Sequence, residues 1–302
     1  MPNVLTNMSP TIIHDEVLPA LKLGLLPLSA FSVDFTDEPL AVGDVKRVGI
    51  ATAREAGELG ASFEDGDTTV ASTAITVATP RSCSWHVDPK REAFPTMERW
   101  LAQARECTYA LAKDILQIPL ALFVTANIGN SDGADAKTVE AAAYDVDDQT
   151  DQWGMLKTKK VAGNISAIHN IAYATAIRKD AALKDKSASG SDMLTTGEMP
   201  PVMGMRQFYT DAFPTALTNE NTGVVFTGTE TVAGIVGGGH VPVDGLEGAA
   251  GVREFVVSDP DTGLSMLYRQ WVNTAKGEYW GAVYAFTGFA FLRDSATRIL
   301  HA

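Results

Sequence analysis

The sequence predicts an α+β fold, in which helices and strands occupy separate stretches of the chain. Three observations predict it: a strand-rich region before residue 88, one unusually long helix after residue 96, and a meander of strands in the last fifty residues. Elements that are segregated in this way favour α+β over an alternating parallel sheet. With 302 residues, of which 45% are hydrophobic, the chain is long enough to bury a sizeable core.

The first stretch, residues 1–41, mixes several prolines and small polar residues with short apolar patches. A helix is expected over residues 15–23. We interpret the stretch as an arm that packs on another surface, either the core of the same chain or a neighbouring subunit.

Residues 42–56 and 70–88 are predicted as two strand regions that form a long hairpin. The stretch between them is rich in glycine and acid, and no Lys or Arg occurs from residue 55 to residue 80. Such a hairpin has little core of its own, so it is expected to lie on another surface.

A short strand then leads into the long helix. Cys83, Trp85 and Val87 alternate with polar residues, which is typical of a half-buried strand. Thr96 is a suitable cap, and apolar residues follow at helical spacing along one narrow face: Trp100, Ala104, Cys107, Leu111, Ile115 and Ile118. The helix is expected over residues 96–127, roughly 45 Å at 1.5 Å per residue.

The remaining elements are predicted in order along the chain. Helices are expected from Thr138, over residues 164–184 and over residues 205–217, before a glycine-rich region. The meander is expected at residues 252–258, 264–272 and 278–292. Asp294 is a candidate cap for a final helix.

Charge and targeting signals exclude several classes of protein. The net charge is −13, with 37 acidic and 24 basic residues, which argues against sequence-specific nucleic-acid binding. The two cysteines, Cys83 and Cys107, are expected to be reduced, buried thiols. A secretory signal and an apolar run long enough to span a bilayer are both absent from the sequence, which predicts a soluble protein of the cell interior.

One motif suggests an enzyme. Residues 129–133, Gly-Asn-Ser-Asp-Gly, match the G-x-S-x-G elbow of serine hydrolases, with Ser131 as nucleophile and His240 or His301 as base. An upstream oxyanion segment is missing, and an ordinary turn explains the pattern as well.

Metal and phosphate sites are predicted to be absent. The acids Asp145, Asp147, Asp148 and Asp151 resemble the start of a calcium loop, but Thr150 and Leu156 stand where that loop needs Gly and Glu. The glycines before His240 lack the lysine of a phosphate loop, and the five histidines show no ligand spacing. We therefore predict a protein without catalytic residues, cofactor or metal.

The order of these parts resembles a known family. The arm at residues 11–18 (TIIHDEVL), the strand start at 42–48 (VGDVKRV), the hairpin, the long helix and a final meander containing YRQW at 268–271 are similar to the major capsid protein of tailed bacteriophages. That fold is shared with encapsulins and the herpesvirus capsid floor. The resemblance implies five segments: an N-terminal arm (1–41), an extended loop (42–95), a peripheral domain (96–194) with spine helix 96–127, an axial domain (195–265), and C-terminal strands and a helix (266–302).

The resemblance implies assembly rather than catalysis. Copies of the chain would form pentamers and hexamers of an icosahedral shell around double-stranded DNA, with non-specific contact to that DNA. It implies a virion protein, assembled in the host cytoplasm, with a portal, optional decoration proteins and no membrane partner. An encapsulin-like compartment is the first alternative, and a serine hydrolase that uses Ser131 is a remote one.

Some details of the family are expected to differ here. No lysine lies between Lys46 and Lys90, which argues against the lysine cross-link of some members. Because the chain starts directly with the arm, we expect a separate scaffolding protein and no N-terminal cleavage. The acids of the loop, Glu64, Asp65 and Asp67, are expected to meet basic residues of another subunit, with Lys157, Lys159 and Lys160 as candidates.

Overall fold

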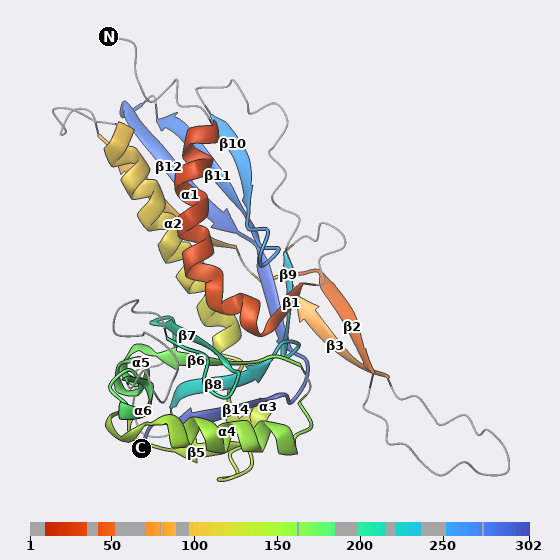
Figure 1. Cartoon of the computed structure of the whole chain (residues 1–302). Helices are drawn as coiled ribbons and strands as arrows, with labels where there is room; N and C mark the ends of the chain where they lie inside the picture. Colours follow the sequence, from red (N-terminus) through yellow and green to blue (C-terminus); the bar gives the residue numbers. More distant parts are fainter. Residues whose placement is uncertain are drawn as a thin grey trace.

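The chain folds into an elongated molecule with two packed parts and one projecting hairpin (Figure 1). The computed structural model describes residues 10–34, 42–51, 70–78, 80–88, 97–161, 163–184, 199–214, 221–236, 252–273 and 275–302. In one part, two long helices pack on a four-stranded sheet. In the other, a five-stranded sheet carries shorter helices.

The four-stranded sheet contains the predicted meander. Its order is β10 (Arg253–Ser258), β11 (Ser265–Asn273), β12 (Glu278–Ala285) and β4 (Arg81–Val87), and every neighbouring pair is antiparallel. Trp85 and Val87 are buried on the face toward the helices, as the alternation predicts. Gly281 lies opposite Trp85, and a Cβ there would come within 2.4 Å of the indole ring. Glycine at this position therefore makes room for the ring.

The long helix, α2 (Met97–Leu120), presents the predicted apolar stripe to this sheet. Trp100, Ala104, Leu111 and Ile115 are buried, whereas Cys107 and Ile118 are half-buried. The helix stops seven residues before the predicted end.

Proline explains the early end of α2. Pro119 has no N–H to donate within the last turn, and the backbone N–H of Leu122 donates to the Pro119 carbonyl at 3.1 Å as the chain turns. The chain then buries Phe123 between Phe31 and Phe291, before a short helix, α3 (Thr125–Ile128).

The first helix lies beside α2. It extends over α1 (Pro10–Leu25), longer than predicted, and continues into a 3₁₀ helix at Leu26–Ala30. Ile13, Val17, Leu21 and Leu25 recur every four residues, and all four are buried. The expected arm therefore packs on the core of its own chain over residues 10–31.

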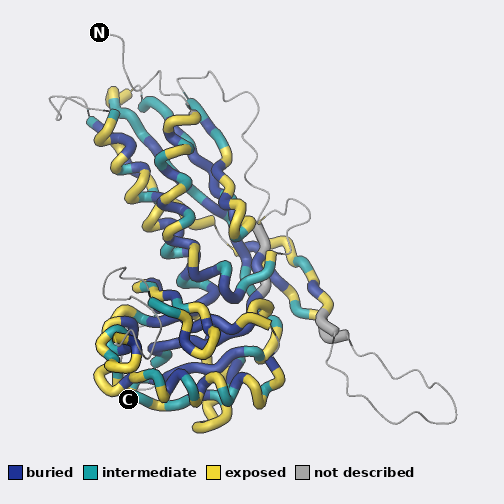
Figure 2. Tube along the Cα trace, viewed as in Figure 1, coloured by how far each residue is buried: buried dark blue, intermediate teal, exposed yellow. Residues whose placement is uncertain are grey.

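The strands of the five-stranded sheet are largely buried (Figure 2), and the sheet has a core of its own on one face, while its other face contributes to the core under α1 and α2. Its order is β5 (Ala136–Thr138), β14 (Ala296–Leu300), β8 (Thr222–Gly228), β6 (Ile165–Asn170) and β7 (Arg206–Thr210). The helices of this part are a 3₁₀ turn (Ala141–Ala143), α4 (Val146–Thr158), α5 (Ile171–Ile177) and α6 (Ala181–Lys184). β5 and β6 precede residue 194, whereas β7, β8 and β14 follow residue 195. The domain boundary predicted between residues 194 and 195 therefore runs through this sheet.

Several predicted helices are wrong in this part. Residues 164–184 form β6 followed by the short α5 and α6, residues 205–217 contain β7, and the helix after Asp294 is β14. All five residues of β14 and the first five of β6 are buried, because both faces of the sheet are covered: each strand contributes side chains to the core under α1 and α2 and to the core on the opposite face. Without a polar face such strands lose their period of two, and their apolar spacing then imitates a helix. The helix expected from Thr138 begins only at Val146.

The predicted hairpin is confirmed over its described strands. β2 (Val45–Ala51) pairs antiparallel with β3 (Val70–Thr76) and projects from the body. Between the middle of β2 and the base of the hairpin, Val48, Ile75 and Val77 are buried and pack against Phe286 and Leu292. A small sheet of β1 (Ser32–Asp34), β9 (Val232–Val236) and β13 (Thr287–Phe291) lies beside this base. The acidic stretch between the strands lies outside the described residues.

Candidate interaction surfaces

The loop around Ser131 is a turn rather than a nucleophile elbow. A helix, α3, precedes it and a strand, β5, follows it, which is the reverse of the strand–turn–helix order that the elbow requires. The Ser131 carbonyl accepts hydrogen bonds from the backbone N–H groups of Asp135 (2.9 Å) and Ala136 (3.2 Å). His301 contacts the Tyr173 hydroxyl at 3.0 Å, and His240 lies outside the described residues. Nothing in this geometry favours a serine hydrolase.

Arg298 of β14 holds this loop from inside. The side chain is 3% exposed, and its Nη2 donates to the Thr125 hydroxyl (2.7 Å) and to the Gly129 carbonyl (3.0 Å). Burial lowers the pKa of the guanidinium, and nearby Asp135 opposes that shift. The only signal in the sequence is an arginine inside an otherwise apolar strand, and our sequence reasoning missed it.

The two cysteines and His169 are the other described side chains that we considered as catalysts. Cys83 and Cys107 are free and half-buried, and burial raises the pKa of the Cys107 thiol to about 12. His169 is fully buried in β6. Its Nδ1 donates to the Phe208 carbonyl (3.1 Å), which leaves Nε2 to accept from the Tyr144 hydroxyl (3.0 Å). Burial lowers the pKa of His169 to about 4, so the ring is neutral near pH 7.

Three of the four acids that resemble a calcium loop, Asp145, Asp148 and Asp151, have structural partners. Asp145 caps α4 by accepting from the backbone N–H of Asp148 (3.0 Å), and Asp148 reciprocates. Lys137 pairs with Asp148 (2.7 Å) and Asp151 (2.5 Å), and these bonds raise the pKa of the lysine. Asp148 is buried as well. Within the described part of the chain, no group of three or more His, Cys, Asp or Glu side chains could hold a metal.

The three lysines proposed as partners for the acidic loop lie at the end of α4. Lys159 is already paired within the subunit, with Asp135 at 2.9 Å and Asp294 at 2.7 Å, and its side chain is 13% exposed. The Lys157 ammonium lies 5.7 Å from the Trp153 ring centroid. Glu64, Asp65 and Asp67 are outside the described residues, so their pairing with these lysines stays a prediction.

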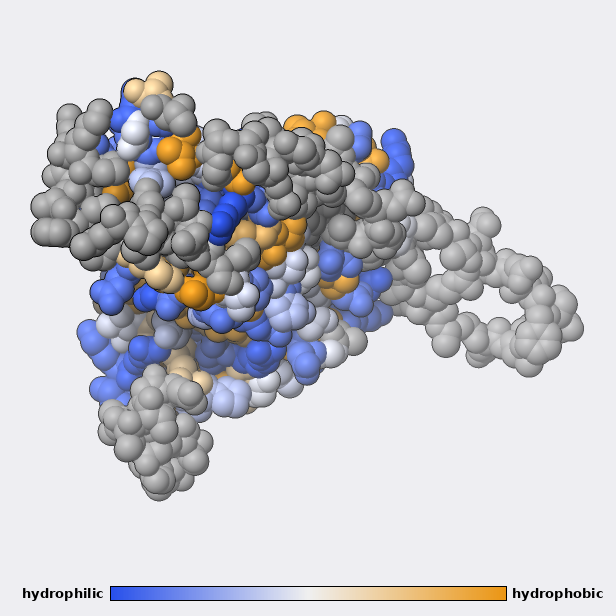
Figure 3. All heavy atoms as spheres, turned by 90° about the horizontal axis from the view of Figure 1, so that it is seen from above, coloured by the Kyte–Doolittle hydropathy of each residue, from blue (hydrophilic) through white to orange (hydrophobic). Residues whose placement is uncertain are grey.

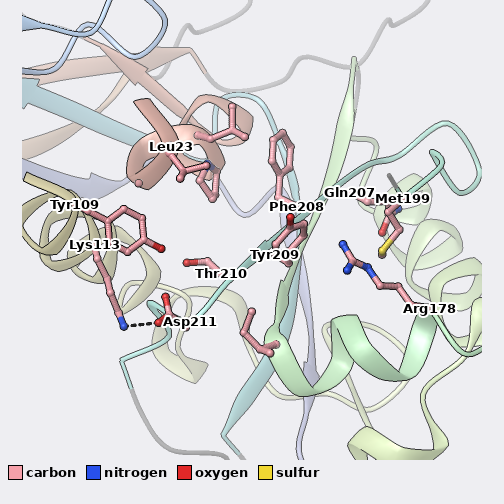
Figure 4. Close-up of a pocket in the computed structure, with 14 residues that line it drawn as sticks. Leu23, Tyr109, Lys113, Arg178, Met199, Gln207, Phe208, Tyr209, Thr210 and Asp211 are labelled. Atoms are coloured by element: carbon pink, nitrogen blue, oxygen red, sulfur yellow. Dashed lines mark hydrogen bonds and ion pairs between the residues drawn. The ribbon is translucent and has the colours of Figure 1, made fainter. Parts of the chain in front are cut away.

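A groove of about 740 Å³ lies where the two parts meet (Figure 4). One wall carries Tyr109 and Lys113 of α2, the opposite wall carries Arg178 and Met199, and β7 runs between them. Lys113 pairs with Asp211 at 2.5 Å. The groove is lined by five of the twelve exposed large hydrophobic side chains found among the described residues: Leu23, Leu26, Tyr109, Ile171 and Tyr209. We call this surface the β7 groove.

A second surface is the face of the four-stranded sheet that points away from the helices. Trp271 lies opposite Trp280 in the register, and Trp280 lies opposite His86. The rings stack, with centroids 6.0 Å apart for the tryptophans and 4.8 Å for His86 and Trp280. His86 is exposed and both indoles are half-exposed. Half-exposed aromatic rings are typical of protein–protein contacts.

Elsewhere hydrophobic residues are scattered on the surface. In the view of Figure 3 the described hydrophobic residues form small patches among hydrophilic ones. Within the described residues, no helix combines the length and the apolarity that a membrane span requires.

Comparison with known proteins gives a result at the level of structure only. Neither a protein-family model nor a curated protein matches the chain. Among solved structures, the capsid of Ralstonia phage GP4 matches with a TM-score of 0.60 and 9% identity, over 90% of this chain and 89% of that chain.

Two further structures give the same result. The capsid structure of the cyanophage P-SCSP1u matches with a TM-score of 0.58 and 10% identity, over 91% of this chain and 86% of that chain. The mature capsid of bacteriophage PhiM1 matches with a TM-score of 0.56 and 12% identity, over 91% and 86%. The chain therefore has the fold of these phage capsid structures, as the segment order predicted.

Proposed function

We propose that this chain is the major structural subunit of an icosahedral shell that encloses double-stranded DNA. The observation that carries the proposal is a fold match over about nine-tenths of the chain, and over a similar share of several phage capsid chains. Because a fold by itself hosts many functions, the surfaces of this chain must support the proposal independently.

Three surfaces support self-association. The β2–β3 hairpin projects from the body, and its buried contacts among the described side chains are those of Val48, Ile75 and Val77. Its isolated strands would be marginal in water and gain stability by lying on a neighbour. The β7 groove and the stacked Trp271–Trp280 face both present apolar side chains to solvent. A subunit with many neighbours has a use for several such surfaces.

The proposed role is structural rather than enzymatic. In the described residues, Ser131 sits in a turn, the Cys107 thiol is protonated and His169 is enclosed by hydrogen-bond partners. A shell subunit needs none of these groups for chemistry.

The finer parts of the proposal concern partners and place. We propose pentamers and hexamers of this chain, a separate scaffolding protein, a portal, optional decoration proteins and non-specific contact with packaged DNA. Assembly would take place in the host cytoplasm, and the product is a virion. The net charge of −13 is compatible with DNA contact only through local basic residues rather than through the whole subunit.

The decisive experiment is negative-stain electron microscopy of the purified chain, expressed alone and together with a candidate scaffolding protein. We expect closed shells tens of nanometres across, or tubes and capsomer rings. A monodisperse monomer or dimer under both conditions would refute the proposal. Nuclease-protected DNA in particles from infected cells, rather than an enclosed enzyme, separates a virus capsid from an encapsulin-like compartment.

A further inference from the structure

The β7 groove contains a cation that has no acidic partner among the described residues. Arg178 follows α5 and lies over the Tyr209 ring, with its guanidinium carbon 4.8 Å from the ring centroid. Its Nε is buried and makes no hydrogen bond, and no acidic side chain pairs with it in the part of the chain that the structure describes. The other two charged side chains that line the groove, Lys113 and Asp211, form an ion pair, so their charges cancel. Counted over its described lining residues, the groove therefore carries one uncompensated positive charge.

A buried N–H donor without an acceptor is costly, so a site of this kind favours a ligand that supplies one. A carboxylate is the best match, because it accepts two parallel hydrogen bonds from a guanidinium. The chain itself has 13 more acidic than basic residues. A second copy therefore brings carboxylates that cannot all be paired within its own fold.

The backbone of β7 borders the same groove. Five consecutive residues, 207–211, line the cavity, although successive side chains of a strand point to opposite faces of the sheet. It is therefore the edge of the strand that faces the groove. Among the described strands, β7 is the last of its sheet and pairs only with β6. Such an edge presents backbone donors and acceptors to any extended segment that enters.

The apolar residues complete the description of the occupant. Tyr209 is 54% exposed and lies under Arg178. Leu23 is 66% exposed and lies on the other side of the groove (Figure 4). An occupant that fits must combine an extended backbone, an apolar side chain and a carboxylate. Addition of a strand to an open edge, with specificity from side-chain pockets, is an established way of binding peptides.

We propose that the β7 groove binds an extended acidic segment from a second copy of this chain, which pairs along β7 and places a carboxylate on Arg178. The inference rests on the proposed shell function and names one contact by which the subunits associate. Arg178 fixes the register of the segment, and the apolar residues of the groove supply contact area.

The first test compares two charge reversals on neighbouring residues. Arg178→Glu changes the charge of the groove. Lys179→Glu makes the same change of charge at an exposed residue that does not line the groove. We expect Arg178→Glu to reduce the yield of closed shells at least about tenfold, the factor that 1.4 kcal/mol per contact would give, while Lys179→Glu assembles like the wild type. Circular dichroism of the unassembled subunit verifies that both variants fold.

The second test identifies the occupant directly. A photo-reactive phenylalanine analogue replaces Tyr209 in the full chain, and cross-linked peptides are mapped by mass spectrometry after illumination. We expect cross-links to an acidic segment of another copy, which mixed light and heavy isotope-labelled subunits distinguish from links within one chain. Cross-links within one chain, or to a different protein, would overturn the inference.

The outcomes keep the two proposals apart. Shells of wild-type protein together with normal assembly of Arg178→Glu and no cross-link between copies would refute the groove contact and leave the shell function intact. Absence of shells in the wild type would refute the shell function. In that case the cross-link at high subunit concentration still decides whether the groove binds a second copy.

Discussion

Gly24 sets the distance between α1 and α2. A Cβ at this position would lie 2.5 Å from the Cβ of Ala112, closer than real carbon contacts allow. Gly→Ala inside a helix ordinarily stabilises a protein by up to about 1 kcal/mol. Here the clash outweighs that gain, so we expect Gly24→Ala to lower the free energy of unfolding by about 1–3 kcal/mol, as measured by urea denaturation.

Gly154 of α4 is the matched control for this change. It is also a helical glycine, but a Cβ there meets nothing within 4 Å. Gly154→Ala should therefore leave stability unchanged or raise it. Equal effects of the two variants would show that helix propensity, rather than the spacing of the helices, decides the outcome.

His169 makes the stability of the part that contains the five-stranded sheet dependent on pH. Its folded pKa, about 4, lies below the ordinary value of 6.5, so folding favours the neutral ring. The unfolded chain binds the proton first as the pH falls. The contribution of His169 is therefore complete above pH 6.5 and is lost progressively as the pH falls toward 4, by roughly 3 kcal/mol in total.

His169→Gln tests this pH dependence. We expect the variant to be less stable at pH 7, because it fits the Phe208 and Tyr144 partners less well, but to lose less stability between pH 6.5 and pH 4. Thermal unfolding of both proteins over that range measures the difference. Parallel profiles would assign the acid sensitivity to carboxylates instead.

At the scale of elements, Arg298 connects β14 to the loop that follows α2. Removing it leaves the Gly129 carbonyl and the Thr125 hydroxyl without their buried donor, although it also removes the cost of a desolvated charge. We expect Arg298→Met to cost about 1–3 kcal/mol and to speed hydrogen exchange of backbone amides around residues 125–131. Arg293→Met, which breaks the exposed pair with Glu230, should change stability by less than about 1 kcal/mol.

The success of sequence reasoning differs between the two parts of the molecule for one physical reason. α2, α1, β4 and the meander each have one buried and one solvated side, so their periodicity is visible in the sequence. β6 and β14 are buried on both sides and carry no periodicity that separates strand from helix. Those two strands account for two of the three wrongly predicted helices.

The candidate surfaces were harder to predict than the elements. The β7 groove joins Leu23, Tyr109, Arg178 and Tyr209, which are far apart in the sequence and share no motif. Residues 129–133, in contrast, form a recognisable motif that the fold uses only as a turn. Contacts between distant elements depend on the topology, and spacing along the chain contains no information about them.

At the scale of the whole molecule, the acidic stretch between β2 and β3 is proposed to bind a neighbouring subunit. Replacement of Glu64, Asp65 and Asp67 by lysine should impair shell assembly while the subunit still folds, because the change affects a contact between copies only. Particle yield by electron microscopy and the melting temperature of the unassembled subunit measure the two effects. Normal shells from the triple variant would exclude this pairing, whichever lysine is the partner.

A second variant tests one of the lysines proposed as partners of the acidic stretch. Lys159 is engaged by Asp135 and Asp294 inside the subunit, so we expect Lys159→Met to lower stability before it affects assembly. A change of assembly without loss of stability would instead identify Lys159 as the partner of the loop.

The hairpin has a mechanical consequence. Strands of seven residues extend about 23 Å at 3.3 Å per residue, and the apolar contacts found among the described side chains, those of Val48, Ile75 and Val77, lie between the middle of β2 and the base of the hairpin. The hairpin can therefore pivot about its base. A rotation of about 10° at the base displaces the far end of the strands by roughly 4 Å, with little loss of buried surface. The direction of the hairpin therefore depends on what its far end contacts. In the proposed shell, one subunit structure can then contact neighbours that meet it at different angles.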